Sequence, residues 1–558
     1  MRSEHSVEIY PFFDAQSRNE ALRCPALHLT VFRKTFVRVS SREHVTNSEI
    51  QALKTESCCA HNHFIAAIVR AVSFAAFLLL LSGCAILQPG GRPSDPLDAL
   101  RFDIEQVLAD SIFIPSQASV KIVSLDAREL LYEHNSKLLM RPASNMKLLT
   151  SSAALSILGP QYQLRTVILA DSSSPDSAIS GNIYIKGYGD PDLLTADLDS
   201  LATQVQQRGV RSVCGGVVAD ISFYDDLYWG HGWIWDDEPD SYAAFITPLA
   251  VNDNCVDVTV TPADSAGRSV SVAVAPSTSY ITLVNKASTV PDSVMNPLVV
   301  TRLFKERLNT ILVEGEMKQG GRTVKEQISV WKPELYAATL FEEALQRRGI
   351  SVSGEPAAGL APATAREMAS CSRNLVPALI NLNKVSDNLS AEMMLKTVSA
   401  VTDKVPGSAR GGTYAVNRFL STFGIDTTKY CLADGSGLSN YNLISAELII
   451  QLLQGMAQRR ELFPTFLESL PIAGVDGTLG NRMKNTPAEG NLKAKTGTIS
   501  GVSSLSGYVH TADGETLAFA MTMQNFTYPT RLYQRAQDKI GALLAGFSRH
   551  GRAALPRR

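Results

Sequence analysis

A long stretch of short β-type segments divides two more helical parts of the chain, and it constrains the fold most strongly. Between residues 163 and 365, β-rich runs such as QLRTVILAD (163–171) and CVDVTVTPA (255–263) are separated by turn residues. Before this stretch, residues 145–158 contain no Pro or Gly and predict a helix. After residue 365 the sequence becomes more helical again. The pattern predicts a β-rich insertion in a domain built from both ends of the chain.

Strand candidates also lie near both ends of the chain. Residues 118–126 and 129–135 predict two strands joined by a turn, and residues 502–510 and 515–523 predict two more. The amphipathic pattern of residues 530–547 predicts a final helix. We therefore expect an α/β fold with a split domain and an insertion. The expected boundaries are 98–162 and 366–550 for the split domain, and 163–365 for the inserted β-rich domain or domains.

The composition excludes several classes of protein. The chain has 558 residues, of which 45% are hydrophobic and 19% are charged, and its formal net charge is −2. This balance is typical of a globular chain with several domains, not of a polytopic membrane protein or a disordered chain. The near-zero charge also argues against nucleic acid as a partner. Because most of the histidines precede residue 84, a His-rich metal site is not expected, and we expect no cofactor.

An apolar run at residues 71–81, AVSFAAFLLLL, follows Arg70 and ends close to Cys84. The run is too short to span a bilayer, which takes about 20 residues. Its order of basic, apolar and small residues is typical of a secretory signal. The sequence LSGC at its end resembles the bacterial lipobox, in which the cysteine becomes the acylated first residue. A buried apolar helix is the alternative interpretation.

The signal predicts where the mature protein begins and where it is located. We expect residues 1–83 to be absent from it, as an extension followed by a lipoprotein signal peptide, with translation starting near Val69. Residues 84–97 contain a Pro/Gly/Ser-rich segment and are expected to form a tether. The protein would then be periplasmic and anchored to a membrane through Cys84. Ala85 after the cysteine favours the outer membrane. Export would permit a disulfide, and Cys214–Cys255 is one possible pairing.

Three short motifs occur in order along the chain: Ser144-Asn145-Met146-Lys147, Ser386-Asp387-Asn388 and Lys495-Thr496-Gly497. The Ser144 hydroxyl is a poor nucleophile without a base, and Lys147 lies one turn along the same face if a helix begins at Ser144. The Lys147 amine can be that base only if its pKa falls well below about 10.4, and burial or a second cation would lower it.

The second and third motifs offer the remaining groups. Lys495 could be the second cation and could also hold an anionic part of the substrate. Ser386 offers a hydroxyl that relays a proton to a leaving amine, and Asn388 offers an amide that orients Lys147 and the substrate. A strand through Lys495 and Thr498 can pair with an extended peptide, and Gly497 keeps that approach free of a side chain.

A second motif with the same spacing, Ser329-Val330-Trp331-Lys332, competes with the first. Pro333 follows it directly, and a residue before proline is pushed towards extended geometry. Proline also favours the first position of a helix, so we expect a helix to begin at Pro333. Ser329 and Lys332 would then lie in a strand and point to opposite faces, which favours Ser144 as the nucleophile.

The three motifs resemble those of the penicillin-binding and serine β-lactamase superfamily. The long β-rich segment between the first and second motifs resembles the class C low-molecular-mass penicillin-binding proteins, the D-alanyl-D-alanine carboxypeptidase/endopeptidases of the DacB type. Supporting segments are GNIYIKGYGDPDL (181–193), GWIWDDEPDSYAA (232–244), ADGSGLSNYNLIS (433–445) and LPIAGVDGTLGNRM (470–483). The resemblance implies a transpeptidase-like domain, with an antiparallel sheet flanked by helices, and the large insertion.

The resemblance also implies an activity and a role for each motif. The protein would be a serine D,D-peptidase that cleaves D-Ala-D-Ala stem peptides of peptidoglycan, and possible peptide cross-links, and that β-lactams acylate. Ser144 would be the nucleophile, Lys147 its base, and Ser386 and Asn388 the rest of the proton network. The substrate carboxylate would be bound by Lys495, Thr496 and Thr498, beside Gly497. The backbone N–H groups of Ser144 and Thr498 would form the oxyanion hole.

An aromatic and acidic segment in the insertion is a further candidate. In the family, an acid in the matching loop reaches towards the amino group of a diaminopimelate stem, and Asp237 and Tyr242 match it best. The alternative is a small aromatic core around Trp229, Trp233 and Trp235 with a solvated acidic turn. Two departures leave the side-chain preference of the substrate open. Asn440 stands where relatives can carry Arg, and Ser500 where a Gln can occur.

Two other functions compete with the peptidase. A β-lactamase or esterase could use the same scaffold and would release the penicilloyl adduct quickly. A non-catalytic lipoprotein that binds the cell wall would have no need of a nucleophile, so the complete set of motif residues argues against it.

Overall fold

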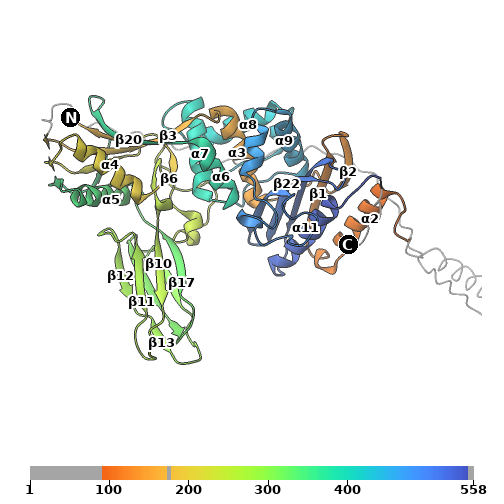
Figure 1. The fold of residues 1–558 in the computed structure, drawn as a ribbon, viewed down its shortest axis with the longest axis horizontal. Coiled ribbons are helices and arrows are strands. Elements are labelled where there is room, and N and C mark those ends of the chain that lie inside the picture. The colour runs from red at the N-terminus through yellow and green to blue at the C-terminus, as the bar shows by residue number, and fades with distance from the viewer. Residues whose placement is uncertain (1–90, 172–176, 551–558) are drawn as a thin grey trace, which may run out of the picture. The chain divides into compact units, whose positions relative to one another are not determined.

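The computed structural model describes residues 91–171 and 177–550, so the leader, Cys84 and most of the tether lie outside the described residues. Both ends of the described chain contribute to one five-stranded antiparallel sheet, in the order β2-β1-β23-β22-β21 (Figure 1). Its strands are β1 (Gln117–Ser124), β2 (Glu129–His134), β21 (Lys493–Ile499), β22 (Val502–His510) and β23 (Thr516–Gln524). None of the helices in the described ranges has the length and apolar character needed to cross a bilayer.

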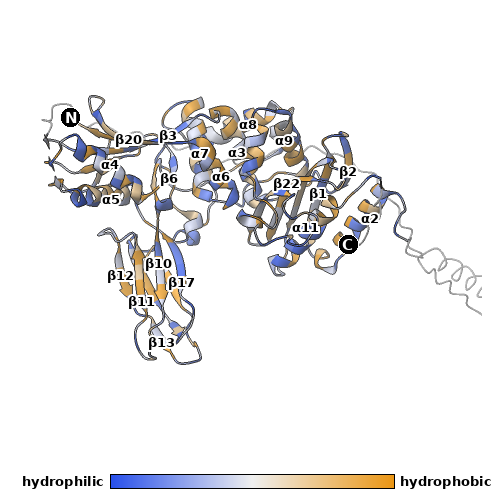
Figure 2. Ribbon diagram, viewed as in Figure 1, coloured by the Kyte–Doolittle hydropathy of each residue, from blue (hydrophilic) through white to orange (hydrophobic). Residues whose placement is uncertain are grey.

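Alternation along β23 explains why helices cover both faces of this sheet. Leu517, Phe519 and Met521 pack with α2 (Pro96–Leu108) and α11 (Thr530–Ala545) on one face. Ala518 and Ala520 face a second core that includes α3 and α9. The helices of this second core are α3 (Met146–Leu158), α6 (Leu375–Lys384), α7 (Asn388–Thr402), α8 (Ala409–Ser421), α9 (Ala446–Gln458) and α10 (Phe463–Ser469). Figure 2 shows that α2 and α11 carry both hydrophilic and hydrophobic residues.

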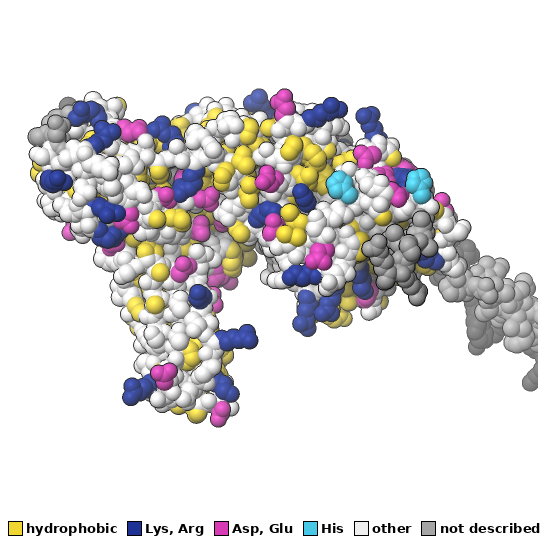
Figure 3. Space-filling model, in the orientation of Figure 1, with side chains coloured by type: hydrophobic (Ala, Val, Ile, Leu, Met, Phe, Trp, Pro, Cys, Tyr) yellow, Lys and Arg dark blue, Asp and Glu magenta, His cyan; other side chains and the backbone are white. Residues whose placement is uncertain are grey.

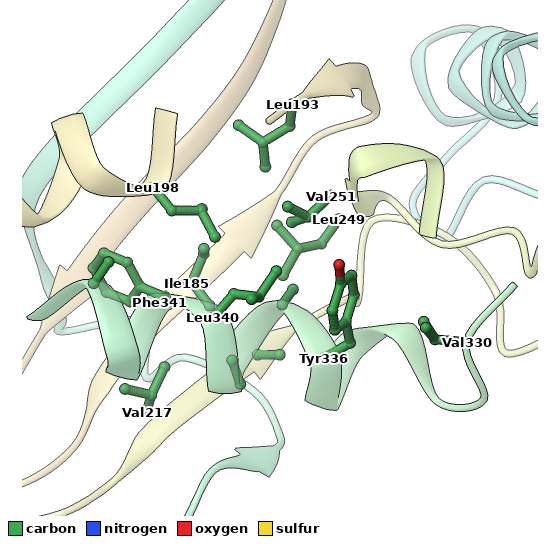
Figure 4. Packing of buried hydrophobic residues seen from close by; sticks show 14 of the residues in the cluster. Ile185, Leu193, Leu198, Val217, Leu249, Val251, Val330, Tyr336, Leu340 and Phe341 are labelled. Carbon is green, nitrogen blue, oxygen red and sulfur yellow. The ribbon is translucent and has the colours of Figure 1, made fainter. Parts of the chain in front are cut away.

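A second five-stranded sheet lies between the first and second motifs along the chain, in the order β19-β8-β5-β3-β20. Its strands are β3 (Gln163–Ala170), β5 (Ile183–Gly187), β8 (Val217–Asp220), β19 (Ala357–Ala358) and β20 (Arg366–Asn374). Two helices belong to this unit: α4 (Thr195–Gln207), which the β-type pattern did not predict, and α5 (Pro333–Arg347), which begins at the predicted Pro333. Figure 4 shows Leu340 and Phe341 of α5 packed towards the strand residues of the same core.

The rest of the insertion is built from short strands. One sheet joins β10 (Cys255–Thr261), β11 (Ser271–Ala275) and β17 (Val324–Ser329), and another joins β12 (Thr282–Asn285), β14 (Val299–Arg302) and β15 (Thr310–Glu314). The remaining strands are β4 (Ala178–Ile179), β6 (Asp190–Leu193), β7 (Ser212–Val213), β9 (Leu249–Val251), β13 (Ser288–Val290), β16 (Glu316–Lys318) and β18 (Ser351–Val352).

The competing Ser329 motif lies within this insertion. Helix α5 begins at Pro333, as predicted, and the buried Ser329 hydroxyl donates a hydrogen bond to the Glu238 carbonyl. Lys332 was expected to be extended and to lie in a strand, but it is not. It has φ of 53°, in the left-handed region, because it forms the turn between the end of β17 and the helix. The Ser329 hydroxyl is therefore buried and hydrogen-bonded within the insertion, and it does not form a pair with Lys332.

The cysteines of the described ranges are all free, so the possible Cys214–Cys255 disulfide is not formed. Cys214 is exposed, whereas Cys255 is buried at the start of β10. On the face shown in Figure 3, basic and acidic side chains are interspersed, in keeping with the near-zero net charge.

Candidate active site

Ser144 and Lys147 lie at the point where a short 3₁₀ turn, Ala143–Asn145, continues into α3. The Lys147 ammonium donates a hydrogen bond to the Ser144 Oγ over 3.0 Å. Asn145 fixes the turn from behind, because its side-chain amide donates to the Lys495 carbonyl (3.1 Å) and to the Ser504 hydroxyl (2.7 Å). The first and third motifs are thus joined through backbone and side-chain contacts behind the nucleophile.

Lys147 has two further acceptors from distant parts of the chain. Its Nζ donates to the Asn388 Oδ1 over 2.5 Å and to the Ser436 carbonyl over 2.9 Å. The side chain is fully buried. Burial lowers the pKa of Lys147 from 10.5 to about 8, although the charges of Asp387, Asp434 and Glu392 raise it. A lysine in this state can lose and regain a proton near neutral pH, as a general base must.

The second motif lies beside the third. Lys495 donates to the Ser386 hydroxyl over 2.8 Å and to the Thr496 carbonyl over 2.9 Å. Burial and the neighbouring charge of Lys147 lower the pKa of Lys495 well below its ordinary value. Ser386 has φ of 68°, a left-handed conformation that is uncommon outside glycine. Asp387 follows as the N-cap of α7 and accepts from the Leu389 and Ser390 backbone N–H groups, which fixes the turn that presents Ser386.

The third motif forms part of β21, the edge strand of the first sheet. Thr496 is buried, and Thr498 is exposed. Gly497 packs directly on the turn of the nucleophile, since a Cβ there would lie 2.9 Å from the Ser144 backbone nitrogen and 2.2 Å from the Ser504 hydroxyl. Glycine is therefore required for the close approach of β21 to Ser144.

The loop of the insertion that carries Asp237 and Tyr242 reaches the second motif. The Asn388 side-chain amide donates to the Tyr242 carbonyl over 2.7 Å, and the Tyr242 hydroxyl donates to Asp237 over 2.8 Å. Partial burial raises the pKa of Asp237, against the hydrogen bond from Tyr242, which lowers it. The Tyr242 side chain is 45% exposed, so the pair lies at the mouth of the site. Of the aromatic core expected as the alternative, Trp229 packs edge-on against Phe245, but Trp235 is 68% exposed and does not form part of a buried core.

Direct hydrogen bonds join Lys147 to Ser144 and Asn388, and Lys495 to Ser386. Asn145 links the two sets through the Lys495 carbonyl. Thr496 and Gly497 complete the same wall, and Thr498 follows on the exposed end of β21. Asn440, one of the two departures, accepts a hydrogen bond from Arg141, three residues before the nucleophile.

Reasoning from the sequence missed several supporting residues. Ser436 supplies a carbonyl to Lys147, and its loop is held by the buried carboxylates of Asp434 and Glu392. The Asp476-Gly477-Thr478 turn contacts residues next to the second motif and in the third. Lys384 donates to Asp476 over 2.6 Å, and the Thr496 hydroxyl donates to the Thr478 hydroxyl over 2.7 Å. The sequence offered one signal for these residues, since segments 433–445 and 470–483 support the family resemblance. It could not show which motif residues they contact.

The chemistry of the site depends on lysine and serine. Within residues 91–171 and 177–550, no cluster of three or more His, Cys, Asp or Glu side chains is arranged to hold a metal ion. The hydroxyl, with the buried amine beside it as a base, can attack a carbonyl. The second buried cation and the exposed strand edge can hold an anionic peptide in place for this attack.

Comparison with known proteins places these features in a family context. The sequence model of the D-Ala-D-Ala carboxypeptidase 3 (S13) family matches residues 100–545. The chain is 37% identical over 469 residues to a D-alanyl-D-alanine carboxypeptidase of Actinomadura sp. (strain R39), covering 81% of this chain and 86% of that protein. It is 28% identical over 419 residues to the carboxypeptidase DacB of Haemophilus influenzae, covering 74% and 87% of the two chains.

Solved structures give a matching result. The crystal structure of penicillin binding protein 4 from Haemophilus influenzae has a TM-score of 0.71 at 26% identity, covering 79% of this chain and 97% of that one. A structure of that protein in complex with a β-lactam has a TM-score of 0.66 at 25% identity, with the same coverage.

Proposed function

Because the chain belongs to the D-Ala-D-Ala carboxypeptidase 3 (S13) family, we propose that Ser144 is the nucleophile with which it cleaves peptidoglycan stem peptides. The protein is a serine-type D-Ala-D-Ala carboxypeptidase that binds penicillin, and the resemblance predicted from the three motifs is confirmed. The observation that carries the assignment of the nucleophile is the 3.0 Å hydrogen bond between the Lys147 Nζ and the Ser144 Oγ in a buried setting.

The reaction begins with neutral Lys147. Its amine accepts the hydroxyl proton of Ser144 while Oγ attacks the carbonyl carbon of the bond between the two D-Ala residues. The backbone N–H groups of Ser144 and Thr498 stabilise the oxyanion that forms. The leaving D-Ala amine takes a proton that Lys147 returns through the Ser386 hydroxyl, and the C–N bond breaks. Water then gives a proton to neutral Lys147 as it attacks the acyl-enzyme ester. The bond between the acyl carbon and the Ser144 Oγ breaks, Oγ regains the proton from Lys147, and the shortened peptide is released.

The two buried lysines have different roles once substrate is bound: Lys147 is the base, and Lys495 binds the substrate carboxylate. Burial, and after it charge repulsion from Lys147, lowers the pKa of Lys495, so the free site does not readily hold two protonated lysines. The terminal carboxylate of the substrate would lie beside Lys495, Thr496 and Thr498, where its negative charge stabilises the Lys495 ammonium. That positive charge in turn favours neutral Lys147, the form that can accept the Ser144 proton. Substrate binding and activation of the base are thereby coupled.

Substrate specificity rests on two further features. The free edge of β21 can pair with an extended peptide, and a cross-linked peptide would occupy the same edge, so we include endopeptidase activity in the proposal. Asp237, held by Tyr242, would bind a free amino group on the side chain of the stem peptide. Replacing Asp237 by Asn should then raise KM for such a peptide and leave KM for its N-acetylated form unchanged.

Release of D-Ala from a synthetic pentapeptide ending in D-Ala-D-Ala tests the activity, and a cross-linked dimer tests the endopeptidase part. The wild type should release D-Ala, whereas Ser144→Ala should release none. A Ser329→Ala variant is the matched control, since Ser329 lies in the insertion, and it should remain active. Rapid turnover of penicillin by the wild type would favour the β-lactamase, and absence of both activities would favour the non-catalytic lipoprotein.

We further propose that the protein is a periplasmic lipoprotein anchored to a membrane, by preference the outer membrane, through acylated Cys84. The support is the sequence of residues 70–84, with its basic, apolar and LSGC segments. In cells, the wild type should sediment with membranes and Cys84→Ala should not be acylated. Intact mass and the N-terminal sequence of the wild type check this. A mature protein that retains residues before Cys84 would contradict it.

A further inference from the structure

Glu392 is a buried carboxylate behind the general base that the mechanism does not use. It lies on α7 four residues after Asn388, so both side chains project from the same face of the helix. Its side chain is fully buried. Burial and the charge of Asp434 raise the pKa of Glu392. Burial of a carboxylate has a large free-energy cost unless its oxygens accept hydrogen bonds.

The partners of Glu392 are backbone groups of the loop at residues 434–439. One oxygen accepts from the Gly435 N–H (2.9 Å) and the Ser436 N–H (2.8 Å), and the other accepts from Gly435 (3.1 Å). Asp434 accepts from the next N–H group, that of Gly437, over 2.8 Å. Two carboxylates thus fix three successive peptide units of this loop.

The loop held in this way presents the Ser436 carbonyl to Lys147 over 2.9 Å. A neutral amine has two hydrogens and one lone pair. In this site the Ser436 carbonyl and the Asn388 amide oxygen can take the two hydrogens. The remaining direction points at Ser144, where the lone pair is needed to accept the hydroxyl proton.

We propose that Glu392 is a positioning residue for the general base: it anchors the 434–439 loop so that the Ser436 carbonyl orients the Lys147 amine towards Ser144. This inference deepens the proposed function and rests on the roles of Ser144 and Lys147 given there. Glu392 touches neither substrate nor the reacting atoms, so its effect is transmitted through the loop and through its charge.

The charge of Glu392 gives the proposal a second readout. The charges of Asp387 and Glu392 at the start of α7 and of Asp434 in the loop act on Lys147, and Lys147 in turn acts on Lys495 of β21. Glu392 favours the protonated form of Lys147, so removing its charge lowers the pKa of the base. The pH at which acylation begins should therefore move down when Glu392 becomes neutral.

The test measures the second-order rate of acylation by a labelled penicillin as a function of pH. In Glu392→Gln, the rate on the high-pH plateau should fall roughly 10- to 100-fold. This loss is smaller than the full contribution of a general base, about 10²–10⁴-fold, because the base is displaced and not removed. The acidic limb of the profile should at the same time move to lower pH. Glu392→Asp keeps the charge but shortens the side chain, so it should lose rate without moving the limb.

Glu334→Gln is the matched control, because Glu334 is a buried carboxylate on α5 of the insertion. It should keep the wild-type rate and pH profile. A wild-type rate in Glu392→Gln, or a lower plateau with an unmoved limb, overturns the proposal. If Glu392→Gln does not fold, a wild-type plateau in Glu392→Asp overturns it. Failure of the wild type to be acylated would instead reject the proposed function.

Discussion

Two lysines carry the chemistry at the scale of the residue, and their burial makes one of them a usable base. Lys147 and Lys495 are both fully buried, and each hydrogen-bonds a motif serine. The sequence predicted that Lys147 needs a lowered pKa and that burial and Lys495 would supply it. In the structure burial lowers the pKa of Lys147, and Lys495 is not among the causes of its shift. The carboxylates that oppose it, Asp434 and Glu392, lie far away in the sequence and could not be placed without the fold.

The lowered pKa of Lys147 predicts how stability depends on pH. The amine has a pKa of about 8 when folded and an ordinary value of 10.5 when exposed. Between these values the unfolded chain binds more protons, so the wild type gains stability as pH rises through this window. The gain is about 3 kcal/mol relative to Lys147→Met, which has no such group. Chemical denaturation of both proteins from pH 7 to pH 10.5 measures it.

Lys396 provides the control for that comparison. It is also buried, on α7, but its ammonium forms an ion pair with Asp225 over 2.6 Å. Lys396→Met leaves Asp225 without its partner and should destabilise the fold at pH 7 by about 3–5 kcal/mol. A difference between wild type and Lys147→Met that stays constant from pH 7 to pH 10.5 would contradict the account of Lys147.

At the scale of the element, strands and helices with strong local patterns were predicted well. The predicted strand at residues 502–510 is β22, and the predicted helix at 145–158 is α3, Met146–Leu158. Helix α4 was missed because β-type runs surround it, whereas the start of α5 at Pro333 was predicted. In α4, Leu198, Leu201, Ala202 and Val205 have helical spacing and are buried, so a signal was present.

The 434–439 loop was the least predictable element, because its role depends on close approach to another segment. Gly437 has φ of 87°, and a Cβ there would lie 1.9 Å from the Ala143 carbonyl oxygen. Gly437→Ala should therefore displace the turn that carries Ser144 and reduce the rate of penicillin acylation at least about 10-fold, as misplaced catalytic groups do. Stopped-flow acylation measures the rate.

Gly514 separates this effect from backbone strain. It has φ of 81° and open space around its Cβ position, so Gly514→Ala bears the strain of about 1–3 kcal/mol without a clash. It should lose stability and keep the acylation rate. Equal acylation rates in the two variants would show that Gly437 does not support the Ser144 turn.

At the scale of the whole molecule, the site is assembled from segments that the insertion separates in sequence. Ser144 precedes the insertion, Ser386 and Lys495 follow it, and the insertion itself returns through Tyr242 to contact Asn388. Trp233 of the same loop donates to Asp434, beside the Ser436 carbonyl that holds Lys147. The order and chemistry of the motifs could be predicted from the sequence. The distances between the motif side chains in the fold, and the return of the loop to Asn388, are tertiary properties that no local sequence pattern encodes.

The central claim is that Ser144 is the acylated nucleophile of a D-Ala-D-Ala carboxypeptidase. Incubation of the full-length protein with a labelled penicillin, followed by peptide mass mapping, tests it most directly. The account predicts a stable penicilloyl adduct on the peptide that contains Ser144, and no adduct in Ser144→Ala. An adduct on Ser329 or any other serine, or no adduct on the folded wild type, would contradict it.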